Sequence, residues 1–120
     1  MKLNEFQQSI EAAEDEQEVR EEIERTVEEN DVVVFMKGNR MMPQCGYSAR
    51  AAKAISLYTE DFVDVDVLRD ERIRQVLEEY SDWPTIPQVF VGGELVGGSD
   101  IVVEMHEEGE LEERISAAVA

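Results

Sequence analysis

The chain has 120 residues, 42% of them hydrophobic, which suffices for one domain with a modest core. Its formal net charge of −18 argues against direct nucleic-acid binding, because contact with phosphates depends on lysine and arginine. We interpret this charge mainly as a solubility feature, with steering or repulsion of partners as the alternative. No apolar run approaches the roughly 18–20 residues of a membrane span, and the first residues lack signal-peptide features. We therefore expect a cytoplasmic protein without membrane contact.

The N-terminal quarter of the chain is acidic and helical in pattern. Residues 1–31 hold 12 acidic and three basic side chains. Apolar residues recur at helical spacing in two sets, which predicts a loosely attached acidic helix at about 3–13 and a better-anchored helix at about 16–29. Asp15 is a candidate cap for the second helix. A partner-binding arm is the alternative interpretation of the first helix.

The rest of the chain alternates between strand and helix patterns. We expect, in order, a strand at 32–36 buried on both faces, a loop at 38–44, a helix at 46–58, a strand at 62–67, a helix at 70–80, strands at 87–91 and 94–96, and a final helix interrupted near Gly109. The strand–helix–strand start predicts a parallel pair, and Gly92-Gly93 predicts an antiparallel hairpin.

These elements indicate an α/β protein of the thioredoxin-like fold. Its four-stranded mixed sheet would be flanked by helices and preceded by the acidic helical extension. We accordingly divide the chain into an N-terminal extension, residues 1–15, and a thioredoxin-like domain, residues 16–120.

Cys45 is the only cysteine, and it lies in the longest segment without an acidic residue. Residues 32–59 contain no Asp or Glu, although a segment of 28 residues would hold about seven at the chain's mean frequency. The same segment has a charge of +4, contributed by Lys37, Arg40, Arg50 and Lys53. Positive surroundings favour a thiolate and attract anions. A single cysteine forms neither an internal disulfide nor a complete metal site, so either role needs a thiol from outside the chain.

The position of Cys45 before a predicted helix also favours a reactive thiolate. Free backbone N–H groups and the helix dipole lower a thiol pKa there, and we expect Lys37 and Arg40 to act in the same direction. Ser48 stands three positions later, where a two-cysteine redox motif has its resolving thiol. Attack on disulfides and ligation of a soft metal both remain open at this point.

Four spaced motifs closely resemble the monothiol glutaredoxin family. The match runs in register from about Asn30 to Glu112, and the family's Cys-Gly-Phe-Ser hallmark is here Cys-Gly-Tyr-Ser, with Tyr47 in place of Phe. Ser99 stands where many relatives have a second cysteine. The matching segments are Met36-Lys37-Gly38, Pro43-Gln44-Cys45-Gly46-Tyr47-Ser48, Trp83-Pro84-Thr85-Ile86-Pro87-Gln88 and Gly97-Gly98-Ser99-Asp100.

The resemblance implies a site for glutathione or a related thiol such as γ-glutamylcysteine. Lys37 and Arg74 match family residues that receive carboxylates of the tripeptide. The backbone of Ile86 would pair with the cysteinyl unit, and Pro87 matches a cis-proline of the family. Ser99 and Asp100 match the end of the site that holds the γ-glutamyl group.

The resemblance further implies an iron–sulfur carrier. A [2Fe–2S] cluster typically takes four thiolates, so one Cys45 from each of two chains and two glutathione-like thiols would complete the set. We therefore expect a cluster-bridged homodimer, a monomeric apo form, and iron–sulfur acceptor proteins as partners. The alternatives are a weak glutathione-dependent thiol–disulfide oxidoreductase that attacks glutathionylated proteins through Cys45, and a regulatory module that senses iron.

Overall fold

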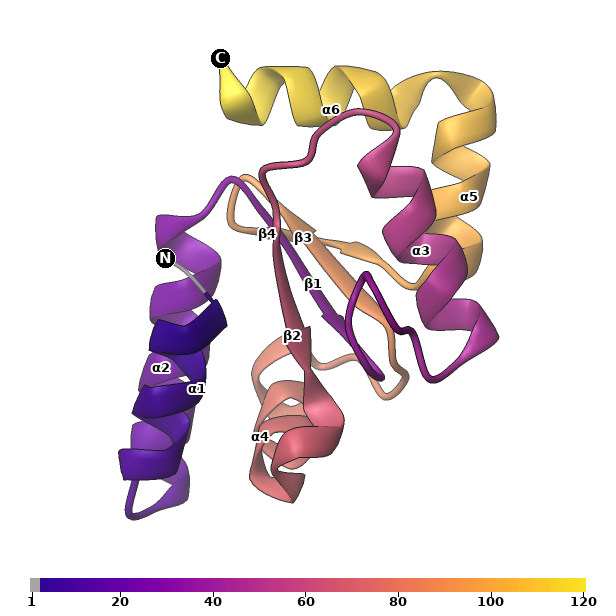
Figure 1. The fold of residues 1–120 in the computed structure, drawn as a ribbon. Helices are drawn as coiled ribbons and strands as arrows, with labels where there is room; N and C mark the ends of the chain where they lie inside the picture. The colour runs from indigo at the N-terminus through magenta and orange to yellow at the C-terminus, as the bar shows by residue number, and fades with distance from the viewer. Residues whose placement is uncertain (1–2) are drawn as a thin grey trace.

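A computed structural model describes residues 3–120 and contains one four-stranded mixed sheet (Figure 1). The strand order is β2-β1-β3-β4, with β1 spanning Val32–Met36, β2 Val63–Asp66, β3 Gln88–Val91 and β4 Glu94–Gly97. The pair β1–β2 is parallel, and the pairs β1–β3 and β3–β4 are antiparallel. The thioredoxin-like arrangement predicted from the sequence is thus confirmed.

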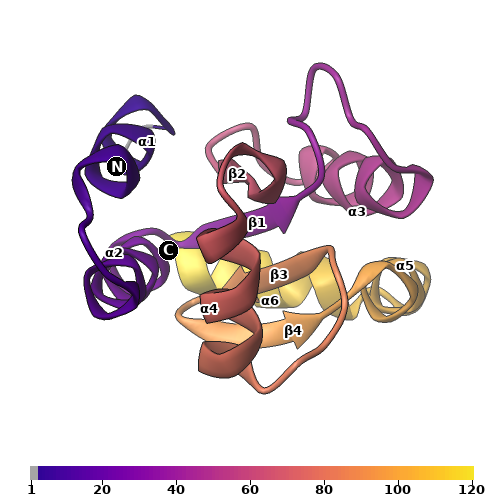
Figure 2. The same ribbon diagram turned by 90° about the horizontal axis from the view of Figure 1, so that it is seen from below.

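Helices cover both faces of the sheet (Figure 2). Helices α1, α2 and α4 contribute to one core cluster, and α3, α5 and α6 contribute to the other. All five residues of β1 are buried, because alternate side chains enter the two clusters. The helices are α1 (Leu3–Ala12), α2 (Glu16–Glu29), α3 (Gly46–Ser56), the short 3₁₀ helix η1 (Val67–Arg69), α4 (Glu71–Ser81), α5 (Ser99–Glu108) and α6 (Glu110–Val119).

The first helix is firmly packed, so the expectation of a loosely attached segment was wrong. Phe6 is 1% exposed and Ile10 is 3% exposed, both within the cluster formed with α2 and α4. The Arg72 guanidinium of α4 donates to the carbonyl oxygens of Ile10 and Ala13, at 3.0 and 2.8 Å. The division of the chain at residue 15 stays a prediction, and its first two residues lie outside the described part.

Helical spacing of apolar residues predicts Ala49, Ala52 and Ile55 on the inner face of α3, and Ile101, Val102 and Met105 on that of α5. The structure differs from both predictions. In α3, Ser48 is buried and Ala49 is only half-buried. In α5, Val102 is buried but Ile101 is 37% exposed, so Ile101 does not face the core. Gly109 does end α5, with a φ of +83° that favours glycine.

No helix in the described range is both long and apolar enough to span a membrane.

Candidate functional site

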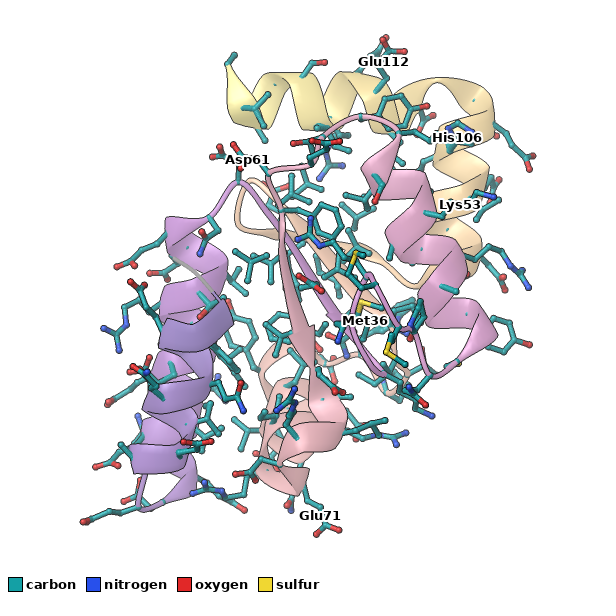
Figure 3. The ribbon with its side chains drawn as sticks, in the orientation of Figure 1. Met36, Lys53, Asp61, Glu71, His106 and Glu112 are labelled. Atoms are coloured by element: carbon teal, nitrogen blue, oxygen red, sulfur yellow. The ribbon has the colours of Figure 1, made fainter. Side chains whose placement is uncertain are left out.

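Cys45 is the residue that precedes α3, at the end of the loop that leaves β1 (Figure 1). Met36, labelled in Figure 3, ends β1 and is buried between the sheet and α3. The Cys45 thiol is half-buried, and its pKa lies below the ordinary value of 9.0. The largest cause is a hydrogen bond from the Ser48 backbone N–H, followed by one from the Tyr47 N–H. Partial burial opposes them, and the positive charge of Lys37 lowers the pKa further.

Ser48 has a structural role at the site that its position in the motif did not reveal. Its side chain is fully buried, and its hydroxyl accepts a hydrogen bond from the Lys37 N–H at 3.1 Å. This bond joins the first turn of α3 to the end of β1. The same hydroxyl contributes a further hydrogen bond that lowers the pKa of Cys45. Ser48 therefore fixes the start of the loop and stabilises the thiolate form of Cys45.

Arg40 does not act on the thiol, which corrects the expectation that it would lower the Cys45 pKa. Its guanidinium pairs with the buried Asp64 carboxylate, with Nη2 2.9 Å from Oδ1, and lies 3.6 Å from the centroid of the Phe62 ring. Lys37 is the basic residue that contributes to the Cys45 pKa. Arg40 and Asp64 lie 24 positions apart, so the charge count over residues 32–59 did not include the partner of Arg40.

A pocket of about 460 Å³ opens between the segment before β3 and the start of α5. Four residues predicted for small-thiol binding line it: Ile86, Pro87, Ser99 and Asp100. Tyr47 lines the same pocket and connects it to the helix that begins beside Cys45. The Ile86–Pro87 peptide bond is cis, as the family resemblance implied.

Two buried polar atoms at this pocket form no hydrogen bond within the described part of the chain. They are Ser99 Oγ and Trp83 Nε1. A Cβ placed on Gly98 would lie 3.3 Å from the Pro87 carbonyl oxygen, so glycine keeps this side of the pocket open. Gly98 also caps α5, and Asp100 lies in the first turn of that helix. Unpaired donors and a helix N-terminus suit carboxylate and amide groups.

The two remaining predicted residues lie outside the lining of this pocket. Arg74 is an exposed residue of α4, and its Nε lies 3.4 Å from the Glu78 carboxylate. Lys37 is half-buried at the end of β1, beside the loop that leads to Cys45. Their contacts with a tripeptide remain predictions.

The comparisons with known proteins agree with this geometry. The glutaredoxin family model matches residues 32–96. The "Probable monothiol glutaredoxin GrlA" of Legionella pneumophila is 54% identical over 88 residues, which is 73% of this chain and 99% of that protein. The chain belongs to the monothiol glutaredoxin family. A ycf64-like monothiol glutaredoxin from Synechocystis is 48% identical over 103 residues, 86% of this chain and 96% of the relative.

Solved structures share the fold of this monothiol glutaredoxin. Reduced apo GrxS14 from poplar has a TM-score of 0.75 at 40% identity, covering 84% of this chain and 93% of its own. A buckwheat glutaredoxin–glutathione complex has a TM-score of 0.77 at 26% identity, covering 88% of this chain and 94% of its own.

Proposed function

We propose that this monothiol glutaredoxin is an iron–sulfur carrier. Two chains, each contributing Cys45, and two glutathione-like thiols hold a [2Fe–2S] cluster as cargo, which then passes to acceptor proteins. The observation that supports this most is the single half-exposed thiol of lowered pKa beside a pocket with unpaired donors. A thiolate is the form that ligates iron, and the chain has no second cysteine to supply the other ligands.

The pocket is the proposed site of the small thiol. Ser99 and the N-terminus of α5 are suited to the γ-glutamyl carboxylate, and the exposed Asp100 carboxylate is suited to its ammonium group. The backbone of Ile86 would meet the cysteinyl unit. The buckwheat relative, whose structure is of a glutathione complex, supports glutathione as the ligand class. We assign Lys37 and Arg74 to the tripeptide's carboxylates on the strength of the motif match.

A glutathione-dependent oxidoreductase is the second candidate, because the same thiolate and pocket serve both functions. Attack of Cys45 on a glutathionylated protein would release the protein thiolate and leave glutathione on Cys45. Ser48 cannot complete the cycle, since a hydroxyl does not resolve a disulfide and this one already accepts from Lys37. A second glutathione would have to do so.

Anaerobic reconstitution with iron, sulfide and glutathione tests the carrier function. We expect a visible cluster chromophore that elutes from a sizing column as a dimer, while the apo protein elutes as a monomer. Cys45→Ser should remain colourless. A coloured monomer, or no chromophore in the wild type, would reject the bridged carrier. Rapid turnover of a glutathione mixed disulfide by the colourless protein would favour the oxidoreductase instead.

A further inference from the structure

The loop before Cys45 has its apolar side chains facing water. Met41 is 83% exposed and Met42 is 67% exposed, although both belong to a well-braced turn. The Asn39 carboxamide oxygen accepts from the N–H groups of Met41 and Met42, both at 2.9 Å. Hydrogen bonds within the loop therefore hold its backbone, while its two methionine side chains face water. This arrangement is the reverse of an ordinary surface loop.

Two residues in the first half of the loop, Gly38 and Arg40, fix its conformation. Arg40 anchors it to Asp64 and Phe62 on the β2 side. Gly38, with a φ of +81°, closes the turn so tightly that a Cβ there would lie 2.4 Å from the Met42 carbonyl oxygen. Figure 2 shows the loop between β1 and α3 projecting beyond the sheet. The methionines are thus presented on an ordered projection beside the thiol.

Tyr47 adds a third exposed apolar group, and we define Met41, Met42 and Tyr47 as the methionine face. Tyr47 is 57% exposed, and the Arg50 guanidinium lies 5.4 Å from its ring centroid. Methionine, tyrosine and arginine are enriched at protein–protein interfaces, and methionine adapts to varied apolar partners. All three side chains lie within four residues of Cys45 in the sequence, and several large exposed apolar groups in one segment are typical of an interaction site.

The charge around the methionine face specifies the partner's chemistry. Lys37, Arg50 and Lys53 form no ion pair within the described residues, whereas Arg40 is neutralised by Asp64. The segment that carries the methionine face therefore keeps three unneutralised positive charges, before and after it in the sequence, in a chain of charge −18. In the proposed bridged dimer, the anionic cluster and small thiols would lie between the two copies. Without them, a second copy would oppose the same cations across the contact and add a second large negative charge. An apolar surface ringed by carboxylates is complementary.

We propose that the methionine face is the docking surface for an acceptor protein that presents an apolar side chain ringed by Asp or Glu beside its own cysteine. The identity of the partner as a cluster acceptor rests on the proposed function. The chemistry of the docking surface does not rest on that function, because it follows from the exposed methionines, the hydrogen bonds that hold their loop, and the unpaired cations. Docking there places the acceptor's thiol next to Cys45, where ligand exchange occurs.

Three cysteine peptides, each a mixed disulfide with 5-thio-2-nitrobenzoate, test the surface in the apo protein. The first has leucine and phenylalanine beside its cysteine and glutamates outside them, the second replaces the apolar residues by serine and glutamine, and the third replaces the glutamates by lysine. The Cys45 thiolate attacks the peptide sulfur, a Cys45–peptide disulfide forms, and the coloured aryl thiolate leaves with the electron pair. Rates are measured at physiological salt, where the screening length of ~8 Å weakens the electrostatic effect of distant acidic side chains of the protein on the peptides.

The acidic apolar peptide should react about tenfold faster than the acidic polar one, because it buries methionine surface. It should also react faster than the basic apolar peptide. Met41→Gln/Met42→Gln should reduce the apolar preference to less than about twofold and leave the rate with oxidised glutathione unchanged. Leu57→Gln, a 61% exposed leucine at the far end of α3, is the matched control and should keep the preference.

Equal rates for the first two peptides, a faster basic peptide, or an unchanged preference in the double variant would overturn the proposal. An apo dimer that the double variant disperses would show that a second copy covers the face, and would also overturn it. If the wild type forms no cluster yet selects the acidic apolar peptide, the carrier function fails and the docking surface stands.

Discussion

At the scale of single residues, the reactivity of Cys45 depends on local donors more than on the surrounding positive charge. The backbone N–H groups of Ser48 and Tyr47 stand ahead of Lys37 among the causes that lower its pKa. Lys37→Gln should raise the Cys45 pKa by removing one of these causes, as measured by iodoacetamide alkylation rate against pH. Lys53→Gln, also on the cationic segment but absent from those causes, should leave the profile in place. Coincident profiles for Lys37→Gln and wild type would show that Lys37 does not act on the thiol.

The lowered pKa also fixes the sign of a pH dependence in stability. Because the thiolate forms more readily in the folded chain than at the ordinary pKa of 9.0, its ionisation favours folding. This contribution is fully present above the unfolded pKa and is lost as pH falls through the folded pKa. The free energy of unfolding of the wild type should therefore gain this contribution as pH rises through the folded pKa of Cys45. Cys45→Ser should lack this gain, as measured by urea titration at several pH values.

Arg40 is the residue that holds the methionine-bearing loop in place. Arg40→Ala should lower the free energy of unfolding by about 2–3 kcal/mol, because the buried Asp64 carboxylate loses its partner. Urea denaturation measures this, with Arg50→Ala as the control, since Arg50 is exposed and contacts only the exposed Tyr47 ring in the described structure. A loss of less than about 0.5 kcal/mol would mean that Arg40 does not brace the loop.

Features of the site that depend on a few consecutive residues could be predicted from the sequence. Contacts between residues far apart in the sequence could not. Cys45 and the cis Ile86–Pro87 bond were identified from short motifs. The Arg40–Asp64 pair and the Ser48–Lys37 bond join residues 24 and 11 positions apart, which no local pattern reveals. The one available signal for Ser48 was its helical spacing, three, four and seven positions before Ala51, Ala52 and Ile55, with which it shares the buried face of α3.

At the scale of elements, helix α1 is a structural part of the domain. Phe6→Ala should lower the free energy of unfolding by about 3 kcal/mol, since Phe6 is 1% exposed in the cluster with α2 and α4. Gln8→Ala, on the exposed side of the same helix, should change it by less than about 0.5 kcal/mol. Thermal and urea unfolding measure both. Equal stability of the two variants would restore the interpretation of a loosely attached helix.

The elements themselves were largely predictable. The apolar run of β1, the Gly92-Gly93 hairpin and the break at Gly109 match the structure because each depends on a few consecutive residues. Docking of α1 was not predicted, because the residue that secures it lies 59 positions or more away in the sequence. What secures it is Arg72, whose guanidinium binds two carbonyl groups of the α1 end.

At the scale of the whole molecule, repulsion among acidic groups opposes folding. The net charge is −18, and the negative charges of Glu104, Glu110 and Glu107 raise the pKa of Glu108. Figure 3 shows Glu112 and Glu71 at opposite ends of the molecule, so the acids are widely distributed. Raising NaCl from low concentration to ~1 M should raise the free energy of unfolding by about 1 kcal/mol, or roughly 5 °C in Tm.

A salt titration of thermal unfolding measures this effect. Glu108→Gln, which removes one carboxylate from the like-charged group at the α5–α6 junction, should show a shallower salt dependence than the wild type. A Tm that falls with NaCl would mean that attractive ion pairs outweigh the repulsion.

In the proposed carrier, each chain uses one small thiol from outside to hold the shared cluster. The most direct test is the glutathione content of the coloured dimer, isolated anaerobically on a sizing column, acid-quenched and assayed for released glutathione against protein and iron. We expect about one glutathione and about one iron per chain, since two Cys45 thiolates leave two of four ligand positions to be filled. A coloured dimer without glutathione would contradict this proposal.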